Sequence, residues 1–147
     1  MRVLRSMGIV VLGVVVLVLG SCNTYVLLFG TESANPQQDL IGSWIISSVS
    51  GAGDYSEYHA LNFYDDDTFT ITNADGAAIE QDDMSEITDT SFRAVIITQT
   101  VYPEYIGGDN YAEYVIKTSG EDTVLRVAFF DDETKATRFV TFVGVKE

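Results

Sequence analysis

The chain has 147 residues, a formal net charge of −14 and a single cysteine, Cys22. All 22 acidic residues follow this cysteine but only six of the eight basic ones do, so the part from Cys22 onward carries a side-chain charge of about −16. A surface this acidic repels phosphate backbones and anionic headgroups, which excludes nucleic-acid binding and electrostatic attachment to a membrane. One cysteine excludes an internal disulfide, a CxxC redox site and a multi-cysteine zinc site.

The first 21 residues are typical of a targeting segment. Arg2 and Arg5 form a short positive region, residues 7–19 are uncharged and largely apolar, and the small pair at 20–21 completes a cleavage site. We therefore predict that residues 1–21 are a signal peptide that is removed from the mature protein.

Cys22 follows Leu19-Gly20-Ser21 directly, and this arrangement resembles the signal of bacterial lipoproteins. The resemblance implies that Cys22 forms a thioether to a diacylglycerol and becomes the new N-terminus. Two or three acyl chains, at about 0.8 kcal/mol per buried CH₂, anchor a protein durably. The protein is then expected in the bacterial cell envelope. Because Asn23 rather than aspartate follows the cysteine, the outer membrane is favoured over the inner one.

Two other interpretations of this segment remain open. Either Cys22 is not lipidated and the protein is secreted, or residues 7–29 are a membrane-spanning anchor, because Tyr25–Phe29 is apolar again and the combined stretch is long enough to cross a bilayer. Residues 22–38 are predicted to be the lipidated N-terminus and a polar tether. Within it, Tyr25–Phe29 either packs on the domain or lies at the bilayer surface.

Residues 39–147 are predicted to form a single all-β domain. Short runs rich in β-branched and aromatic residues are separated by turn residues every eight to twelve positions, which indicates an antiparallel up-and-down β-barrel of about eight strands. The expected strands are 43–50, 57–64, 68–73, 77–80, 91–101, 110–118, 123–130 and 137–146.

Alternation along three of these runs predicts which side chains face the barrel interior. The inward residues are Phe69 and Ile71, then Ala112, Tyr114 and Ile116, and finally Leu125, Val127 and Phe129.

Two stretches resemble lipocalin-like barrels. "DLIGSWIISS" (39–48) contains the Gly-x-Trp motif of their first strand, in Gly42 and Trp44, and "LNFYDDDTFTI" (61–71) is similar to the second and third strands of bacterial lipocalin-like lipoproteins. The resemblance implies that Gly42 and Trp44 close the base of the barrel and that Arg138 lies across the indole ring. Many relatives carry glycine in the turn where Asp67 stands here.

The only histidine, His59, shares a face with Leu61 and Phe63 by alternation and is expected to point inward. We name His59, Phe63, Phe69 and Tyr114 as candidate ligand contacts; the alternative for His59 is a hydrogen-bonded residue near a strand end. No Ser-His-Asp or Cys-His arrangement is evident, so we predict no catalytic residue, no cofactor and no enzyme activity.

Acidic clusters at 65–67, 82–83 and 131–133 are interpreted as solvated turns, with calcium binding as the alternative. No stretch has EF-hand spacing, and no metal site is predicted. The tyrosine-rich stretch at 101–111 is either a lid over the barrel mouth or an ordinary surface loop.

The function expected from these features is non-catalytic binding of a small apolar ligand by a lipid-anchored envelope protein. Eight strands leave room for side chains alone or for one small ligand. The alternative is therefore a barrel filled by its own side chains that docks to an envelope protein partner.

Overall fold

A computed structural model describes residues 22–131 and 138–147. The predicted signal peptide, residues 1–21, lies outside this range.

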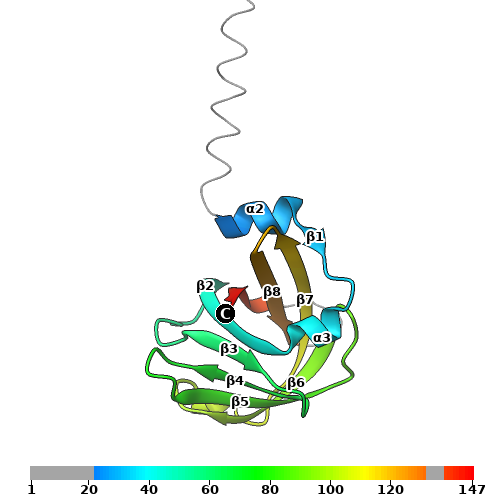
Figure 1. Ribbon diagram of the computed structural model, residues 1–147. Helices are drawn as coiled ribbons and strands as arrows, with labels where there is room; N and C mark the ends of the chain where they lie inside the picture. Colours follow the sequence, from blue (N-terminus) through cyan, green and yellow to red (C-terminus); the bar gives the residue numbers. More distant parts are fainter. Residues whose placement is uncertain (1–21, 132–137) are drawn as a thin grey trace, which may run out of the picture.

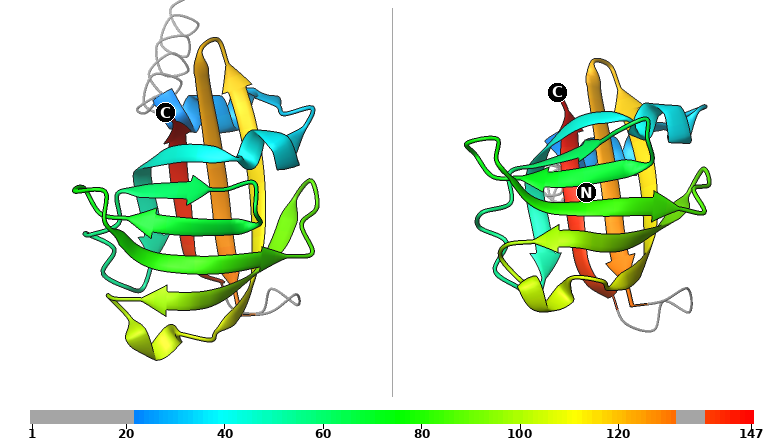
Figure 2. Two further views of the ribbon diagram at one scale, coloured as in Figure 1. Left: turned by 60° about the horizontal axis from the view of Figure 1, so that its bottom comes forward. Right: turned by 90° about the horizontal axis from the view of Figure 1, so that it is seen from below.

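Eight strands form one closed antiparallel barrel, as the sequence predicts (Figures 1 and 2). Each strand pairs with the next one along the chain, and the last strand, β9, pairs with the first, β2. Closure removes the free edges that an open sheet would expose. The strands are β2 (Gly42–Gly51), β3 (Ala60–Phe63), β4 (Thr68–Thr72), β5 (Ala78–Ser85), β6 (Ser91–Gln99), β7 (Asp109–Ser119), β8 (Asp122–Phe130) and β9 (Arg138–Lys146).

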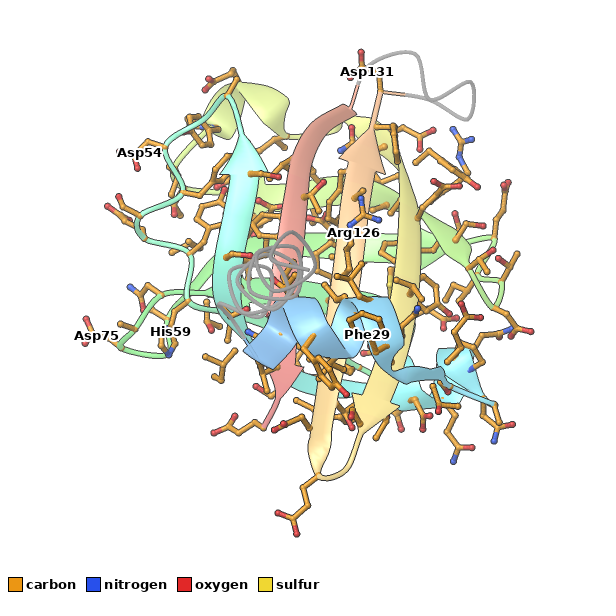
Figure 3. The ribbon with its side chains drawn as sticks, turned by 90° about the horizontal axis from the view of Figure 1, so that it is seen from above. Phe29, Asp54, His59, Asp75, Arg126 and Asp131 are labelled. Carbon is orange, nitrogen blue, oxygen red and sulfur yellow. The ribbon has the colours of Figure 1, made fainter. Side chains whose placement is uncertain are left out.

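The segment expected to be a tether is folded onto the barrel instead. It forms α2 (Cys22–Phe29), β1 (Thr31–Glu32) and α3 (Pro36–Leu40), and β1 adds to the end of β7 in antiparallel register. Helix α2 lies across the outer face of β7 and β8 (Figures 1 and 3). Val26 of α2 is only 1% exposed. The expectation of a polar tether over residues 22–38 is therefore wrong.

The inward faces predicted by alternation are confirmed on β4, β7 and β8. All the residues named there are at most 4% exposed. Outward-facing Val124 is also fully buried, because β8 is covered by α2. A strand buried on both faces loses its clean alternation.

One end of the barrel, which we call the closed end, is filled by Trp44, Phe63, Phe69 and Phe92. Their side chains are at most 1% exposed, and the three phenylalanine rings lie with their centroids 5.1–6.1 Å apart, within the range of attractive aromatic pairs. Helix α3 packs against this end, and the indole Nε1 of Trp44 donates a hydrogen bond to the Leu40 carbonyl at 2.8 Å. Trp44 is thus fully buried at the end of the barrel that α3 covers.

The cation over the indole ring is Lys146, whose Nζ lies 5.0 Å from the ring centroid. The same ammonium donates hydrogen bonds to the carbonyls of Asp39 and Ile41, next to Gly42. The expectation named Arg138 for this position. In the strand register Trp44 pairs with Lys146, whereas Arg138 begins β9 eight residues earlier, roughly 26 Å away along the strand. The side chain of Arg138 lies outside the described part of the chain.

Two backbone positions explain local sequence choices. Asp67 has a φ of +61°, so it adopts the left-handed conformation that glycine adopts most readily. A Cβ on Gly144 would lie 2.9 Å from the Cβ of Trp44, so the indole packs against β9 only because residue 144 has no side chain.

Candidate functional site

The other end of the barrel, which we call the open end, contains a cavity of about 740 Å³. Its floor is apolar, its wall on β5 and β6 is polar, and its mouth is formed by the loops at 52–58 and 102–108 together with the end of β8. The lining residues include Tyr55, Tyr58, Ile71, Glu80, Asp82, Ile96, Gln99, Tyr102, Phe129, Val140 and Phe142, with Asp54, Glu104 and Asp131 at the mouth.

Two carboxylic acids on β5 point into this cavity. Along a strand every second side chain lies on the same face, and Glu80, Asp82 and Met84 form the buried series, with exposed fractions of 8%, 1% and 9%. The intervening Gln81 and Asp83 are exposed. Two acidic side chains inside a barrel are unusual, because burial of a carboxylate without hydrogen-bond partners is energetically costly.

Glu80 is held by a small hydrogen-bond network. Its Oε2 accepts from the Tyr58 hydroxyl at 3.3 Å and from Nε2 of Gln99. Gln99 Nε2 also contacts the Tyr58 hydroxyl at 3.0 Å. The side-chain oxygen of Gln99, Oε1, accepts a hydrogen bond from the backbone N–H of Val101 at 3.0 Å. This bond orients the side-chain amide so that its NH₂ group points toward Glu80.

Asp82 has no comparable set of donors. In the described part of the chain, nothing donates a hydrogen bond to its Oδ1. The side chain finds a partner only as the protonated acid, in a hydrogen bond with Glu80. The ionised form of Asp82 is therefore buried, faces the cavity and lacks a donor.

Burial raises the pKa values of both acids, so they stay protonated at a higher pH than acids in water. Desolvation raises the pKa of Glu80 to about 7. Desolvation and then the nearby charge of Glu80 raise the pKa of Asp82 to about 9. The same burial and the charge of Glu80 raise the pKa of Tyr58. Because the two carboxyl groups titrate as a pair, they share at least one proton at neutral pH.

Aromatic rings line the approach to the pair. Tyr58 stacks on Phe142 with centroids 5.9 Å apart and an interplanar angle of 10°, and Tyr55 meets both rings edge-on at 5.2 and 5.8 Å. The apolar parts of these rings continue into the floor at Phe129, whose ring lies 6.2 Å from Phe142.

The two loops at the mouth are tied together by Tyr102. Its hydroxyl donates to the Asp54 carbonyl at 2.8 Å and accepts from the Asp54 backbone N–H at 2.5 Å. Glycine is needed at position 53, because a Cβ there would lie only about 3 Å from the Tyr102 hydroxyl. The tyrosine-rich stretch at 101–111, which contains the 3₁₀ turn η1 (Pro103–Tyr105), therefore belongs to the mouth of the cavity.

The predicted ligand contacts lie elsewhere. Phe63 and Phe69 belong to the closed end and are not among the residues that line the cavity. Tyr114 is buried, and its hydroxyl donates to the Thr88 carbonyl at 2.7 Å. His59 is exposed and lies at the periphery of the molecule (Figure 3), so its predicted inward position is wrong. The preceding residue, Tyr58, takes the inward place because the strand begins only at Ala60.

The residues that sequence reasoning missed are Tyr58, Glu80, Asp82 and Gln99. The run at 77–80 continues to Ser85 in the structure, and Asp82 belongs to this strand, so its interpretation as part of a solvated turn is wrong. A usable signal existed in the alternation of Glu80, Asp82 and Met84 with polar neighbours, since the methionine marks the inward face.

Within residues 22–131 and 138–147, no three His, Cys, Asp or Glu side chains gather as a metal site would require. Over the same residues, no helix has the length and apolar character needed to cross a membrane. Comparison of the sequence with known protein families and with curated proteins finds no match.

Proposed function

We propose that this protein is a non-catalytic binding protein of the bacterial cell envelope that holds one small molecule in the open end of its barrel. The observation that carries the proposal is the cavity with Asp82 buried in its wall. Its volume of about 740 Å³ falls in the range of pockets that enclose small ligands, roughly 300–1,000 Å³. A buried polar group without a partner costs about 1–3 kcal/mol, and a ligand that supplies a donor removes that cost.

The lining supports a ligand with two unlike ends. Ile71, Phe129 and Phe142 offer an apolar floor, which suits the apolar body expected from the sequence. Glu80 and Asp82 require hydrogen-bond donors from the other end of the ligand.

Binding without chemistry fits the arrangement better than catalysis does. Carboxylic acids with raised pKa values also occur in active sites, and glycosidases use two of them. There, however, the two carboxyl groups stand at least about 5 Å apart, on either side of the bond that is cleaved. Here Glu80 and Asp82 are alternate residues on the same face of one strand, β5, rather than on opposite walls of the cavity. Among the described lining residues no Ser, Thr, Cys or His is available as a nucleophile or base.

Attachment through a lipid on Cys22 is part of the same proposal. Cys22 is the first residue of α2, and α2 also exposes Tyr25, Leu28 and Phe29 by 43%, 56% and 66%. Such side chains beside a lipidated residue suit the headgroup region of a bilayer. Asp54 and Asp131 lie at the end of the barrel away from α2 (Figure 3), so the mouth of the cavity stays accessible when α2 rests on the membrane. The outer membrane remains the favoured location.

Native mass spectrometry of the full chain, extracted from its own host's membranes with a mild detergent, tests both parts. We expect one adduct that stays on the protein after denaturation, the acyl chains on Cys22, and a second stoichiometric mass that denaturation releases. The Cys22→Ala variant should lose the first mass, while a Ser47→Ala variant should lose neither. A protein without a releasable mass would contradict ligand binding and favour a barrel that docks to a protein partner.

A further inference from the structure

The charge of the cavity restricts the chemistry of its ligand. Glu80 and Asp82 lie inside, and Asp54, Glu104 and Asp131 surround the mouth. The pKa of Asp54 is lowered by hydrogen bonds from Ser56, so this mouth carboxylate stays ionised. No basic side chain lines the cavity among the residues that the structure describes. Among these described residues, an anionic ligand such as a fatty acid would meet only acidic side chains and no counter-charge.

The described basic side chains are engaged or placed elsewhere. Arg93 forms an ion pair with Asp109 at 2.8 Å, and Lys146 lies at the closed end over Trp44. Lys117 and Arg126 lie on the outer faces of β7 and β8, and Figure 3 shows Arg126 on the side of the barrel that α2 covers. None of them balances the acids in the cavity wall.

The acid pair itself has the hydrogen-bonding pattern of a cation receptor. The two carboxyl groups have four acceptor oxygens. Glu80 Oε2 is satisfied by Tyr58 and Gln99, and Asp82 Oδ1 has no donor when ionised. Without a ligand, a proton held by the two carboxyl groups provides the positive charge and the hydrogen-bond donor that the pair needs. An ammonium group brings the same positive charge and up to three N–H donors.

The surrounding rings complete such a receptor. Tyr55, Tyr58 and Phe142 form a contiguous aromatic wall beside the acids. Aromatic faces attract cations, most strongly where water is excluded. The floor at Ile71 and Phe129 accepts an apolar body.

We propose that the open end binds an organic amine with an apolar body, whose ammonium group replaces the shared proton between Asp82 and Glu80. This inference rests on the proposed ligand-binding function and specifies the ligand class. The exchange is balanced: the protonated amine enters, the O–H bond of one carboxyl group breaks and its proton leaves to solvent, so the charge of the site is unchanged. Tyr58 and Gln99 hold Glu80 in place, whereas Asp83, on the outward face of β5, does not line the cavity and supplies only the smallest of the effects that raise the pKa of Asp82.

The proton exchange gives the binding a pH dependence. The groups that face the ammonium position are Glu80 and Asp82 from β5, Tyr58 from the loop before β3, and Gln99 from β6. Burial raises the pKa of both acids, so amine affinity should increase as the pH rises from 6 to 9. Near neutral pH, binding should release a proton to the buffer.

Isothermal titration calorimetry on the full chain in detergent tests the inference. The probes are matched sets of an amine, an alcohol and a carboxylate that share a butyl, a phenylethyl or a naphthylmethyl group. We expect at least one amine to bind about tenfold or more tightly than its alcohol, since hydrogen bonds between charged groups are the stronger kind, and its carboxylate to bind most weakly. The binding enthalpy at pH 7 should differ between phosphate and HEPES buffers, neither of which contains a primary amine, because a proton is released.

Variants separate the pair from its surroundings. Asp82→Asn should lower amine affinity about tenfold and remove the buffer dependence, while the neighbouring Asp83→Asn, which removes only the smallest of the effects on the pKa of Asp82, should change both far less. If an alcohol or carboxylate binds as tightly as its amine, the amine inference is wrong but ligand binding stands. If an amine binds Asp82→Asn as tightly as it binds the unmodified protein, the amine inference is likewise wrong, and ligand binding still stands. If no probe binds and native mass spectrometry finds no releasable mass, the proposed function itself fails.

Discussion

The two ends of the barrel are built from the same strands, yet one is filled and the other is hollow. At the closed end, Trp44 and three phenylalanine rings occupy the interior. At the open end, the corresponding positions of β5 and β6 carry Glu80, Asp82 and Gln99, and a cavity of about 740 Å³ remains. An eight-stranded barrel has an interior just large enough to be filled by side chains. The choice of inward residues, rather than the fold, therefore decides which end can accept a ligand.

The difference also separates stability from function. The closed end buries large apolar side chains, which is the main favourable term in folding. The open end buries acids at a cost. Changes at the closed end should affect folding, and changes at the open end should affect pH dependence and binding.

The largest effect is expected from Trp44→Ala. The substitution removes a fully buried indole and its hydrogen bond to Leu40, and it leaves Lys146 without its aromatic partner. We expect a loss of roughly 3–5 kcal/mol in the free energy of unfolding, measured by urea denaturation. Tyr64→Ala, which truncates a 45% exposed ring outside the barrel, is the control and should cost far less. Similar losses for the two variants would contradict the closed end as the main source of stability.

The next effect is a dependence of stability on pH that originates at the open end. In the unfolded chain Glu80 and Asp82 ionise near pH 4, whereas in the folded protein their pKa values are about 7 and about 9. Between these values the unfolded state has released protons that the folded state still holds. The free energy of unfolding therefore falls as the pH rises from 4 to 9. Glu80 alone contributes roughly 3 kcal/mol at about 1.4 kcal/mol per pKa unit, and Asp82 adds to this loss.

Urea denaturation at a series of pH values measures this slope. Asp82→Asn should flatten it, because the amide does not ionise. Asp83→Asn removes a charge from the exposed neighbour on the same strand and should leave the slope in place. Equal slopes in the two variants would show that the buried pair is not the cause.

A smaller effect is expected from Tyr102→Phe. The variant keeps the ring but loses the hydroxyl that donates to the Asp54 carbonyl and accepts from its N–H. We expect a loss of about 1 kcal/mol and faster hydrogen exchange in the loop at 52–58, with unchanged exchange in β7 and β8. Unchanged exchange at 52–58 would mean that Tyr102 does not hold the mouth together.

The smallest effect is expected from His59→Ala. His59 is exposed, and its backbone alone takes part in the hydrogen bonds with Ile46 and Thr72. Stability should change by less than about 0.5 kcal/mol, and ligand affinity should not change. A large loss of binding would restore the inward role that the sequence predicts for this histidine.

The strands could be predicted from the sequence because burial of one face imposes a period of two on apolar residues. Phe69 and Ile71, or Leu125 and Val127, show this pattern directly. The same rule fails on β5, where the inward face carries acids and therefore resembles a solvent-exposed face. It also fails at His59, because parity can be counted only within a strand and the strand starts after this residue.

Two further features, helix α2 and the cation over Trp44, could not be predicted from sequence patterns, for physical reasons. Helix α2 has only eight residues, too few to show helical periodicity, and its position depends on packing against the outer face of β7 and β8. The cation over Trp44 depends on strand register, which pairs Trp44 with Lys146. The spacing of strands and turns predicts the barrel architecture, but the site depends on which polar residues meet inside.

The most direct test of the two-ended barrel is methyl NMR of the protein during titration with the phenylethyl probes, the amine and the alcohol. Ile71, Ile96 and Val140 line the cavity and report on the open end. Ile116 and Leu125 pair at the level of Gly144, which packs on Trp44, and report on the closed end. We predict chemical-shift changes that saturate with one ligand and are confined to the first group. Changes centred on the second group, or none in either group with both probes, would contradict a binding site at the open end.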